Sequence, residues 1–161
     1  MKKLKAFSLI EIIVVLGIIT MILGMTTVYF FNYKAGAALK ISANNIMAAL
    51  NQARSWAITR QIEHGVVFDL ANSEYRVFAK PDLATRQFVN KEMKTSSGVV
   101  IESTTLPNDA LISNNPVAVF NITGSAEANA SIFLKNSQGE YYTLTIVNAT
   151  GRVRIFNYQK L

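Results

Sequence analysis

Cysteine is absent from this chain of 161 residues. That absence excludes disulfides, thiolate nucleophiles and cysteine-based zinc sites together. No H-E-x-x-H, G-x-S-x-G, P-loop or dinucleotide-binding glycine pattern occurs, and the acidic residues are scattered without the density of a calcium loop. We therefore predict that the protein is not an enzyme, with no catalytic residue, no metal site, no cofactor and no small-molecule substrate.

Histidine occurs once, as His64, between the predicted helix and the first predicted strand. A catalytic histidine needs a carboxylate or a nucleophile within reach, and nothing beyond the adjacent Glu63 marks such a site. We interpret His64 as a solvated turn residue.

Charged residues are also few, at 16%, whereas hydrophobic residues make up 50% and the mean hydropathy is +0.24. These values are high for a soluble domain and point to a membrane segment. Three of the charges behind the net charge of +6 are Lys2, Lys3 and Lys5, at the start of the chain. The basicity is thus partly a targeting feature and is weak evidence for nucleic-acid binding.

Residues 7–31 form an almost wholly apolar run. A helix needs about 20 such residues to cross a bilayer, and the basic residues before it predict a cytoplasmic amino terminus. The run is too long for a cleaved secretory signal, and no small-residue cleavage site follows it. We predict a single transmembrane helix. A plain signal anchor is the alternative interpretation, and the next observation argues against it.

Glu11 is the one charged residue in this run. A carboxylate in a membrane span is costly and usually has a function and a partner, and nothing else in the span can pair with it. If the chain is cut after Ala6, Phe7 gains a free amine about one helical turn away from Glu11. In a filament of staggered helices, Glu11 of one subunit could neutralise the Phe7 amine of its neighbour.

The lysine-rich leader, the small residue Ala6 and the sequence Phe7-Ser8-Leu9-Ile10-Glu11 resemble the class III signal of type IV pilins and pseudopilins. The resemblance implies a leader over residues 1–6, cleavage between Ala6 and Phe7 by a prepilin peptidase, and N-methylation of Phe7. It also implies that Glu11 acts in assembly. The family usually has glycine before the cut, where this chain has Ala6.

The helical period continues after residue 31, without an interrupting proline. Residues at spacings of three and four form one amphipathic face: Leu39, Ser42, Ile46, Ala49, Leu50, Ala53, Trp56 and Ala57. We predict a helix to about Arg60 whose second half, 32–60, packs on a globular head. A coiled-coil seam is the alternative, but Trp56 is a poor seam residue, and we expect it to be buried against a sheet.

Alternating β patterns separated by turn residues follow the helix. The predicted strands are 65–70, 74–78, 98–102, 117–122, 131–135, 141–147 and 152–156, with polar loops over 80–97 and 103–115. We therefore predict an α+β pilin fold, a long helix followed by an antiparallel sheet, with the head spanning residues 32–161.

Three further patches resemble the H-type (GspH-like) minor pseudopilins of type II secretion and the FimT/FimU minor pilins. They are residues 53–58 (ARSWAI), Phe120 with Gly124, and the terminal Gly151-Arg-Val-Arg154. The resemblance implies a minor filament subunit of a tip or initiation complex, working with other pilin subunits in secretion, adhesion, twitching or DNA uptake. It also implies an anchor in inner-membrane lipid and a head in the periplasm or outside the cell.

Arg152 and Arg154 carry a second hypothesis. Strand side chains alternate between faces, so both guanidinium groups should point the same way. They are either solvated or a contact for phosphate, with Arg76 and Lys160 as candidate neighbours. FimT-like minor pilins with a GRxR ending are linked to DNA uptake, so the alternative function is a DNA-binding minor pilin used in competence.

Overall fold

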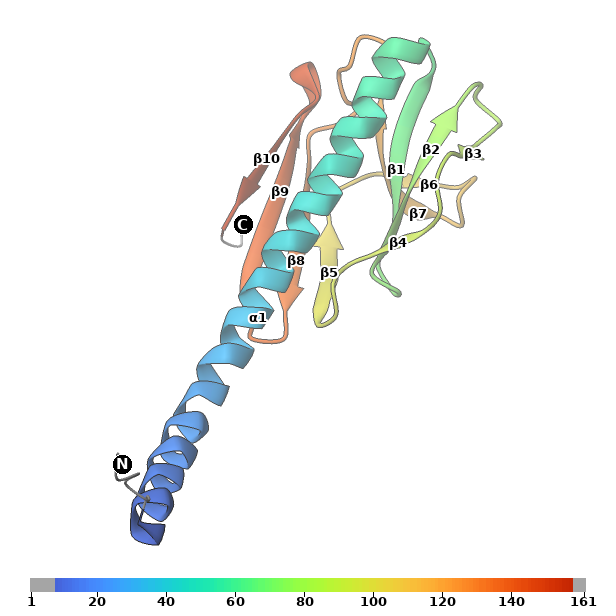
Figure 1. Ribbon diagram of the computed structural model, residues 1–161. Coiled ribbons are helices and arrows are strands. Elements are labelled where there is room, and N and C mark those ends of the chain that lie inside the picture. Colours follow the sequence, from blue (N-terminus) through green and yellow to red (C-terminus); the bar gives the residue numbers. More distant parts are fainter. Residues whose placement is uncertain (1–7, 158–161) are drawn as a thin grey trace, which may run out of the picture. The chain divides into compact units, whose positions relative to one another are not determined.

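The computed structural model describes residues 8–157, and it describes side chains over 8–24 and 33–157. One helix, α1 (Leu9–Arg60), is followed by ten strands (Figure 1). The chain divides into two compact units, residues 1–34 and 35–161. The predicted order of one long helix and then an antiparallel head is confirmed, and with it the α+β fold class.

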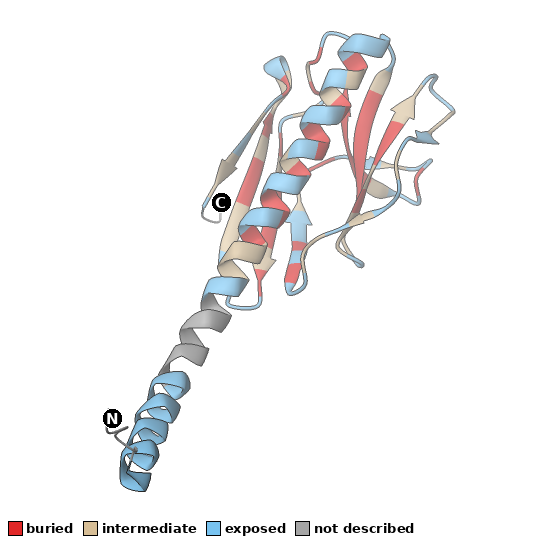
Figure 2. Cartoon of the chain, viewed as in Figure 1, coloured by how far each residue is buried: buried red, intermediate tan, exposed pale blue. Residues whose placement is uncertain are grey.

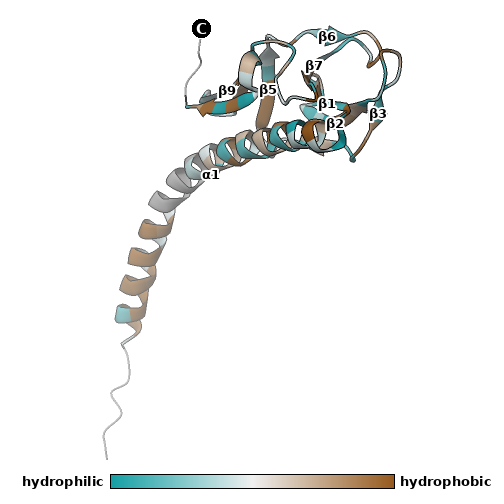
Figure 3. Cartoon of the chain, turned by 90° about the horizontal axis from the view of Figure 1, so that it is seen from above, coloured by the Kyte–Doolittle hydropathy of each residue, from teal (hydrophilic) through white to brown (hydrophobic). Residues whose placement is uncertain are grey.

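The first unit contains the beginning of α1. Every described side chain from Ser8 to Gly24 is exposed, and Figure 3 colours this stretch as hydrophobic nearly throughout. Among the residues whose side chains are described, no helix offers an apolar stretch long enough to cross a membrane. The predicted span 7–31 lies partly outside them, because Phe7 and the side chains of 25–32 are not described.

In the second unit, α1 presents the predicted face to the core. Figure 2 shows buried and exposed residues alternating along this part of the helix. The buried residues are Leu39, Ser42, Ala43, Ile46, Ala49, Leu50, Ala53 and Ala57. Four of them are alanines, and small side chains let the helix approach the strands closely. Trp56, predicted to be buried, is only half-buried at the edge of this core.

Two antiparallel sheets complete the unit (Figure 1). The first has the order β3-β2-β1-β7-β6, with β4 also paired to β2, and the second has the order β10-β9-β8-β5. The first sheet consists of β1 (Glu63–Asp69), β2 (Glu74–Lys80), β3 (Gln87–Phe88), β4 (Met93–Lys94), β6 (Asn108–Asp109) and β7 (Asn115–Phe120). The second consists of β5 (Val99–Thr104), β8 (Ala130–Asn136), β9 (Tyr141–Val147) and β10 (Arg152–Phe156).

All seven predicted strands are present, with ends that differ by a few residues. The two predicted loops contain the short strands β3, β4 and β6, which the sequence analysis missed. β3 and β4 pair with β2, β6 pairs with β7, and the second loop adds Ile112 to the face of the first sheet that points away from the helix. A second apolar cluster forms there from Val67, Phe78, Ile112, Val117 and Val119. For this reason β1 is buried on both faces along most of its length.

The prediction for His64 was wrong. It lies in β1 and is 1% exposed, with its ring centroid 6.0 Å from that of Trp56. Nδ1 lies 2.7 Å from the carbonyl oxygen of Ile62, so Nδ1 carries the hydrogen and donates it. Nε2 is buried and has no hydrogen-bond partner among the described residues. The histidine is therefore part of the packing between the helix and the first sheet.

Candidate functional site

Glu11 lies in the first turn of α1. Ser8 starts the helix: its carbonyl oxygen accepts hydrogen bonds from the backbone N–H groups of Glu11 (3.1 Å) and Ile12 (3.4 Å). Glu11 is exposed and forms no ion pair with any described residue. Ala6 and Phe7, the predicted cleavage and methylation residues, lie outside the described residues. The roles of all three residues therefore stay predictions.

The structure brings together three patches that lie far apart in the sequence. Nε of Arg54, on the helix, donates a 2.8 Å hydrogen bond to the carbonyl oxygen of Gly124. Gly151 packs against the same group: a Cβ placed on Gly151 would lie 2.0 Å from the Gly124 oxygen and 3.0 Å from Arg54 Nε. A Cβ on Gly124 would lie 2.6 Å from Cδ1 of Ile58. We call Arg54, Ile58, Gly124 and Gly151 the arginine–glycine cluster.

Two turns hold the glycines of this cluster in place. Asn121 Oδ1 accepts hydrogen bonds from the backbone N–H groups of Thr123 (3.0 Å) and Ser125 (3.1 Å), which closes the turn around Gly124. The carbonyl oxygen of Asn148 accepts a 2.9 Å bond from the N–H of Ala126, which joins this turn to the one before β10. Both glycines have positive φ, +83° and +60°. The cluster therefore fixes the start of β10 relative to the helix.

Arg54 belongs to the 53–58 patch, but no role was predicted for its side chain. Its spacing of four from Ile58 puts both side chains on one side of the helix, directed at the glycine turns. The positive φ of both glycines and the close packing explain why glycine stands at each position.

Arg152 and Arg154 are both exposed and lie on one face of β10, as predicted. Neither forms an ion pair with a described residue. Two acids of the second sheet region have other partners: Glu102 binds Lys135 at 2.9 Å, and Glu140 accepts a 2.7 Å bond from Asn136. Arg76 is no neighbour, because it lies on the first sheet over the ring of Phe88. Lys160 lies outside the described residues.

Ion pairs on the first sheet join its strands to one another and to the neighbouring loops. Lys80 Nζ lies 2.9 Å from carboxylate oxygens of both Glu63 and Glu127. Burial works against the charged form of Lys80, but the hydrogen bonds to the two carboxylates outweigh it and raise the pKa. Arg86 binds Asp109 at 2.7 Å. Burial alone would raise the pKa of Asp109, yet the hydrogen bond from Arg86 holds it below its usual value.

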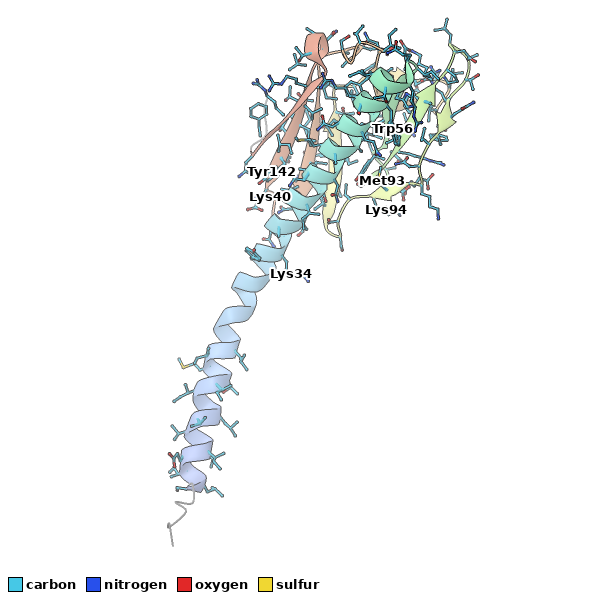
Figure 4. All side chains as sticks on the ribbon, turned by 45° about the horizontal axis from the view of Figure 1, so that its top comes forward. Lys34, Lys40, Trp56, Met93, Lys94 and Tyr142 are labelled. Atoms are coloured by element: carbon cyan, nitrogen blue, oxygen red, sulfur yellow. The ribbon has the colours of Figure 1, made fainter. Side chains whose placement is uncertain are left out.

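An open groove of about 840 Å³ runs between α1 and β4, where Figure 4 labels Met93 and Lys94. Its lining consists of Asn45, Ala48, Ala49, Asn51, Gln52, Tyr75, Met93 and Lys94. This lining holds no nucleophile beside a base. In the part of the chain that the structure describes, no group of three or more His, Cys, Asp or Glu residues could hold a metal ion.

Comparison with known proteins agrees with this picture. The family model described as type II transport protein GspH matches residues 42–151. The minor pseudopilin EpsH from the type 2 secretion system of Vibrio cholerae has a TM-score of 0.60 at 15% identity, covering 74% of this chain and 96% of that chain. The Pseudomonas aeruginosa type IV minor pilin FimU has a TM-score of 0.53 at 14% identity, covering 73% and 92%. No curated protein sequence matches the chain.

A single helix followed by an antiparallel head is the fold of pseudopilins and pilins, which are structural subunits and not enzymes. Since the family model covers more than half of the sequence, the chain belongs to the GspH family. It is a minor pseudopilin or minor pilin, a subunit of a type II secretion or type IV pilus filament. Its partners include other pilin or pseudopilin subunits.

Proposed function

We propose that this subunit is anchored in the bacterial inner membrane by residues 7–31 and enters the filament through that helix. The observation that carries the proposal is the exposure of every described side chain from Ser8 to Gly24, nearly all of them apolar. An apolar surface of this kind needs lipid or other helices to cover it. The amino terminus starts in the cytoplasm, and the head lies in the periplasm or outside the cell.

The assembly step uses Glu11. In lipid its carboxylate has no solvation and no partner among the described residues, so a neighbouring subunit must supply a cation. The Phe7 amine, released by a prepilin peptidase and then methylated, is that cation in our proposal. The subunit belongs to a tip or initiation complex, because a minor subunit is too scarce to form the length of a filament.

Processing is tested by intact-mass analysis of protein purified from membranes. We expect a mass that begins at Phe7 and carries one added methyl group, because the leader, Ala6 and the FSLIE sequence stand in the register that the peptidase requires. An Ala6→Gly variant should be cleaved equally well or better. A chain that keeps residues 1–6 in cells with an active prepilin peptidase would show that the segment is a plain signal anchor.

DNA binding is a second candidate function, favoured by the exposure of Arg152 and Arg154 on one face without a carboxylate partner in the described part of the chain. Two to three phosphate contacts would give a slope of roughly −2 to −3 in log K against log salt, with weak affinity. We expect the full-length protein in detergent to bind a double-stranded oligonucleotide at low salt, and an Arg152→Gln, Arg154→Gln double variant to lose that binding.

The matched control for this titration is a Lys40→Gln, Lys91→Gln double variant, which removes the same charge from exposed positions elsewhere. Fluorescence anisotropy across a salt series measures all three proteins. An equal loss of DNA affinity in both double variants would mean that binding depends only on net charge. Equal affinity of all three proteins would mean that Arg152 and Arg154 do not bind DNA.

A further inference from the structure

The two sheets have four edges, and they differ in how they are closed. In the first sheet the edge strands β3 and β6 have two residues each, too short to template another strand. In the second sheet the edges are β5, with six residues, and β10, with five. Only these two are long enough, among the described strands, to offer a ladder of backbone groups to another chain.

The β5 edge is closed by features of its own. Its pairing with β8 shifts register between Ile101 and Ser103, and such irregularities bend an edge away from further pairing. The N–H of Ile101 donates a 3.2 Å bond to Oγ of Ser73. The carbonyl oxygen of Val99 accepts a 2.6 Å bond from Oγ1 of Thr95. Two backbone groups along this edge of β5 are therefore already used within the chain.

Between Val153 and Ile155 the β10 edge has no such closure in the described residues, whereas the N–H of Arg152 donates a 3.4 Å bond to Oγ1 of Thr150. It pairs in regular register with β9 on one side, and no described strand lies on the other (Figure 1). Alternate N–H and C=O groups of an edge strand point outward. Val153 and Ile155 pack on the core but stay half-buried, so their outer flanks lack cover. A further strand would satisfy the backbone groups and cover these two side chains.

The arginines determine which strand can bind. If two copies of β10 paired with each other, Arg152 and Arg154 would face the arginines of the second copy, and like charges across a ladder are destabilising. The chain contains no two acidic residues spaced two apart, the spacing that would place both on one strand face opposite the arginines. A second copy of this chain therefore supplies no matching strand.

We propose that β10 is the docking edge for an extended segment of a different protein, with two carboxylates two residues apart facing Arg152 and Arg154. The proposal rests on the role of the chain as a filament subunit and adds the surface and chemistry by which another protein joins it. The partner segment adds one strand to the second sheet, next to β10. Its carboxylates pair with the guanidinium groups on the exposed face, and its apolar residues cover Val153 and Ile155.

Nucleic acid fits these observations less well. Phosphates would neutralise Arg152 and Arg154, but they would not pair with the outward backbone groups between Val153 and Ile155. They would also leave Val153 and Ile155 as exposed as they are now. An extended polypeptide accounts for the charges, the open ladder and the half-buried side chains together.

The test uses full-length protein in detergent and a fluorescent peptide, Thr-Val-Glu-Val-Glu-Val-Thr, followed by anisotropy at low salt. We expect the wild type to bind this peptide. An Arg152→Glu, Arg154→Glu variant should bind it with an affinity reduced by about tenfold or more. The reversed variant should instead bind the peptide in which lysine replaces glutamate. Far-ultraviolet circular dichroism and Trp56 emission identify any variant that does not fold.

Two further peptides need no protein variant. One is N-methylated at its valines and the other at its glutamates, so that each blocks one of the two hydrogen-bonding edges of the strand. Strand addition predicts that one of them loses binding. Equal binding of both, absence of peptide binding, or binding of double-stranded DNA alone would each overturn the proposal. Incorporation of the subunit into sheared filaments would remain intact in those cases, and the proposed function with it.

Discussion

A Glu11→Leu variant is expected to insert into the membrane at least as well as the wild type and to be largely missing from sheared filaments. Insertion improves because a charge costs roughly 2.5–3.5 kcal/mol at the centre of a span, and less near its start. Assembly fails because the Phe7 amine of a neighbouring subunit loses its counterion. Breaking a buried ion pair costs about 3–5 kcal/mol, enough to reduce incorporation by more than tenfold.

Two measurements separate these effects. Carbonate extraction of membranes reports insertion, and immunoblotting of sheared filaments reports incorporation, both relative to wild type. Glu11→Gln keeps the shape and removes the charge, so it should behave like Glu11→Leu. Met21→Leu changes an exposed apolar residue on the same helix and should leave both readouts unchanged. Glu11→Leu at wild-type levels in filaments would refute the ion-pair argument.

The fold was predictable from sequence to the extent that periodicity reports it. In seven strands of five to seven residues, apolar and polar residues alternate or apolar residues follow one another for long enough to be recognised. The buried helix face from Leu39 to Ala57 follows the helical period. The strands β3, β4 and β6 have two residues each, and no period can be read over two residues. They form because the loops pair with the edges of β2 and β7, which is a tertiary effect.

His64 and Arg54 show two different reasons for a missed role. His64 was predictable: Val66 and Phe68 face the helix, and alternation backwards along β1 puts His64 on the same side. The error was to begin the strand two residues late, at Gly65. Arg54 was not predictable in this way, because its partner Gly124 lies 70 residues away and only the folded chain brings that turn to the helix.

The roles of Ala6, Phe7 and Glu11 differ again, since they depend on other molecules. A peptidase and neighbouring subunits would act on these residues, and the fold of one chain contains neither. The sequence is informative here because a lone carboxylate in an apolar run is costly and needs a reason. For Arg152 and Arg154, alternation correctly predicted a shared face, while their lack of carboxylate partners in the described residues became visible only in the structure.

A Gly151→Ala variant is expected to lose about 3 kcal/mol or more of stability. The added Cβ would lie 2.0 Å from the carbonyl oxygen of Gly124, so the turn or the helix must move. The φ of +60° adds the strain of a left-handed conformation. The same movement would disturb the 2.8 Å bond from Arg54 and the start of β10. Trp56, the only tryptophan, lies on the same stretch of helix as Arg54 and reports thermal unfolding by its emission.

Gly139→Ala is the matched control, because Gly139 has a φ of +80° but nothing within 4 Å of an added Cβ. It should lose only the conformational strain, about 1 kcal/mol. The difference between the two melting temperatures then isolates the contact with Gly124, and we expect it to be roughly 5–10 °C for a domain of this size. Equal melting temperatures would mean that the arginine–glycine cluster accommodates the added Cβ without loss of stability and does not fix β10 against the helix.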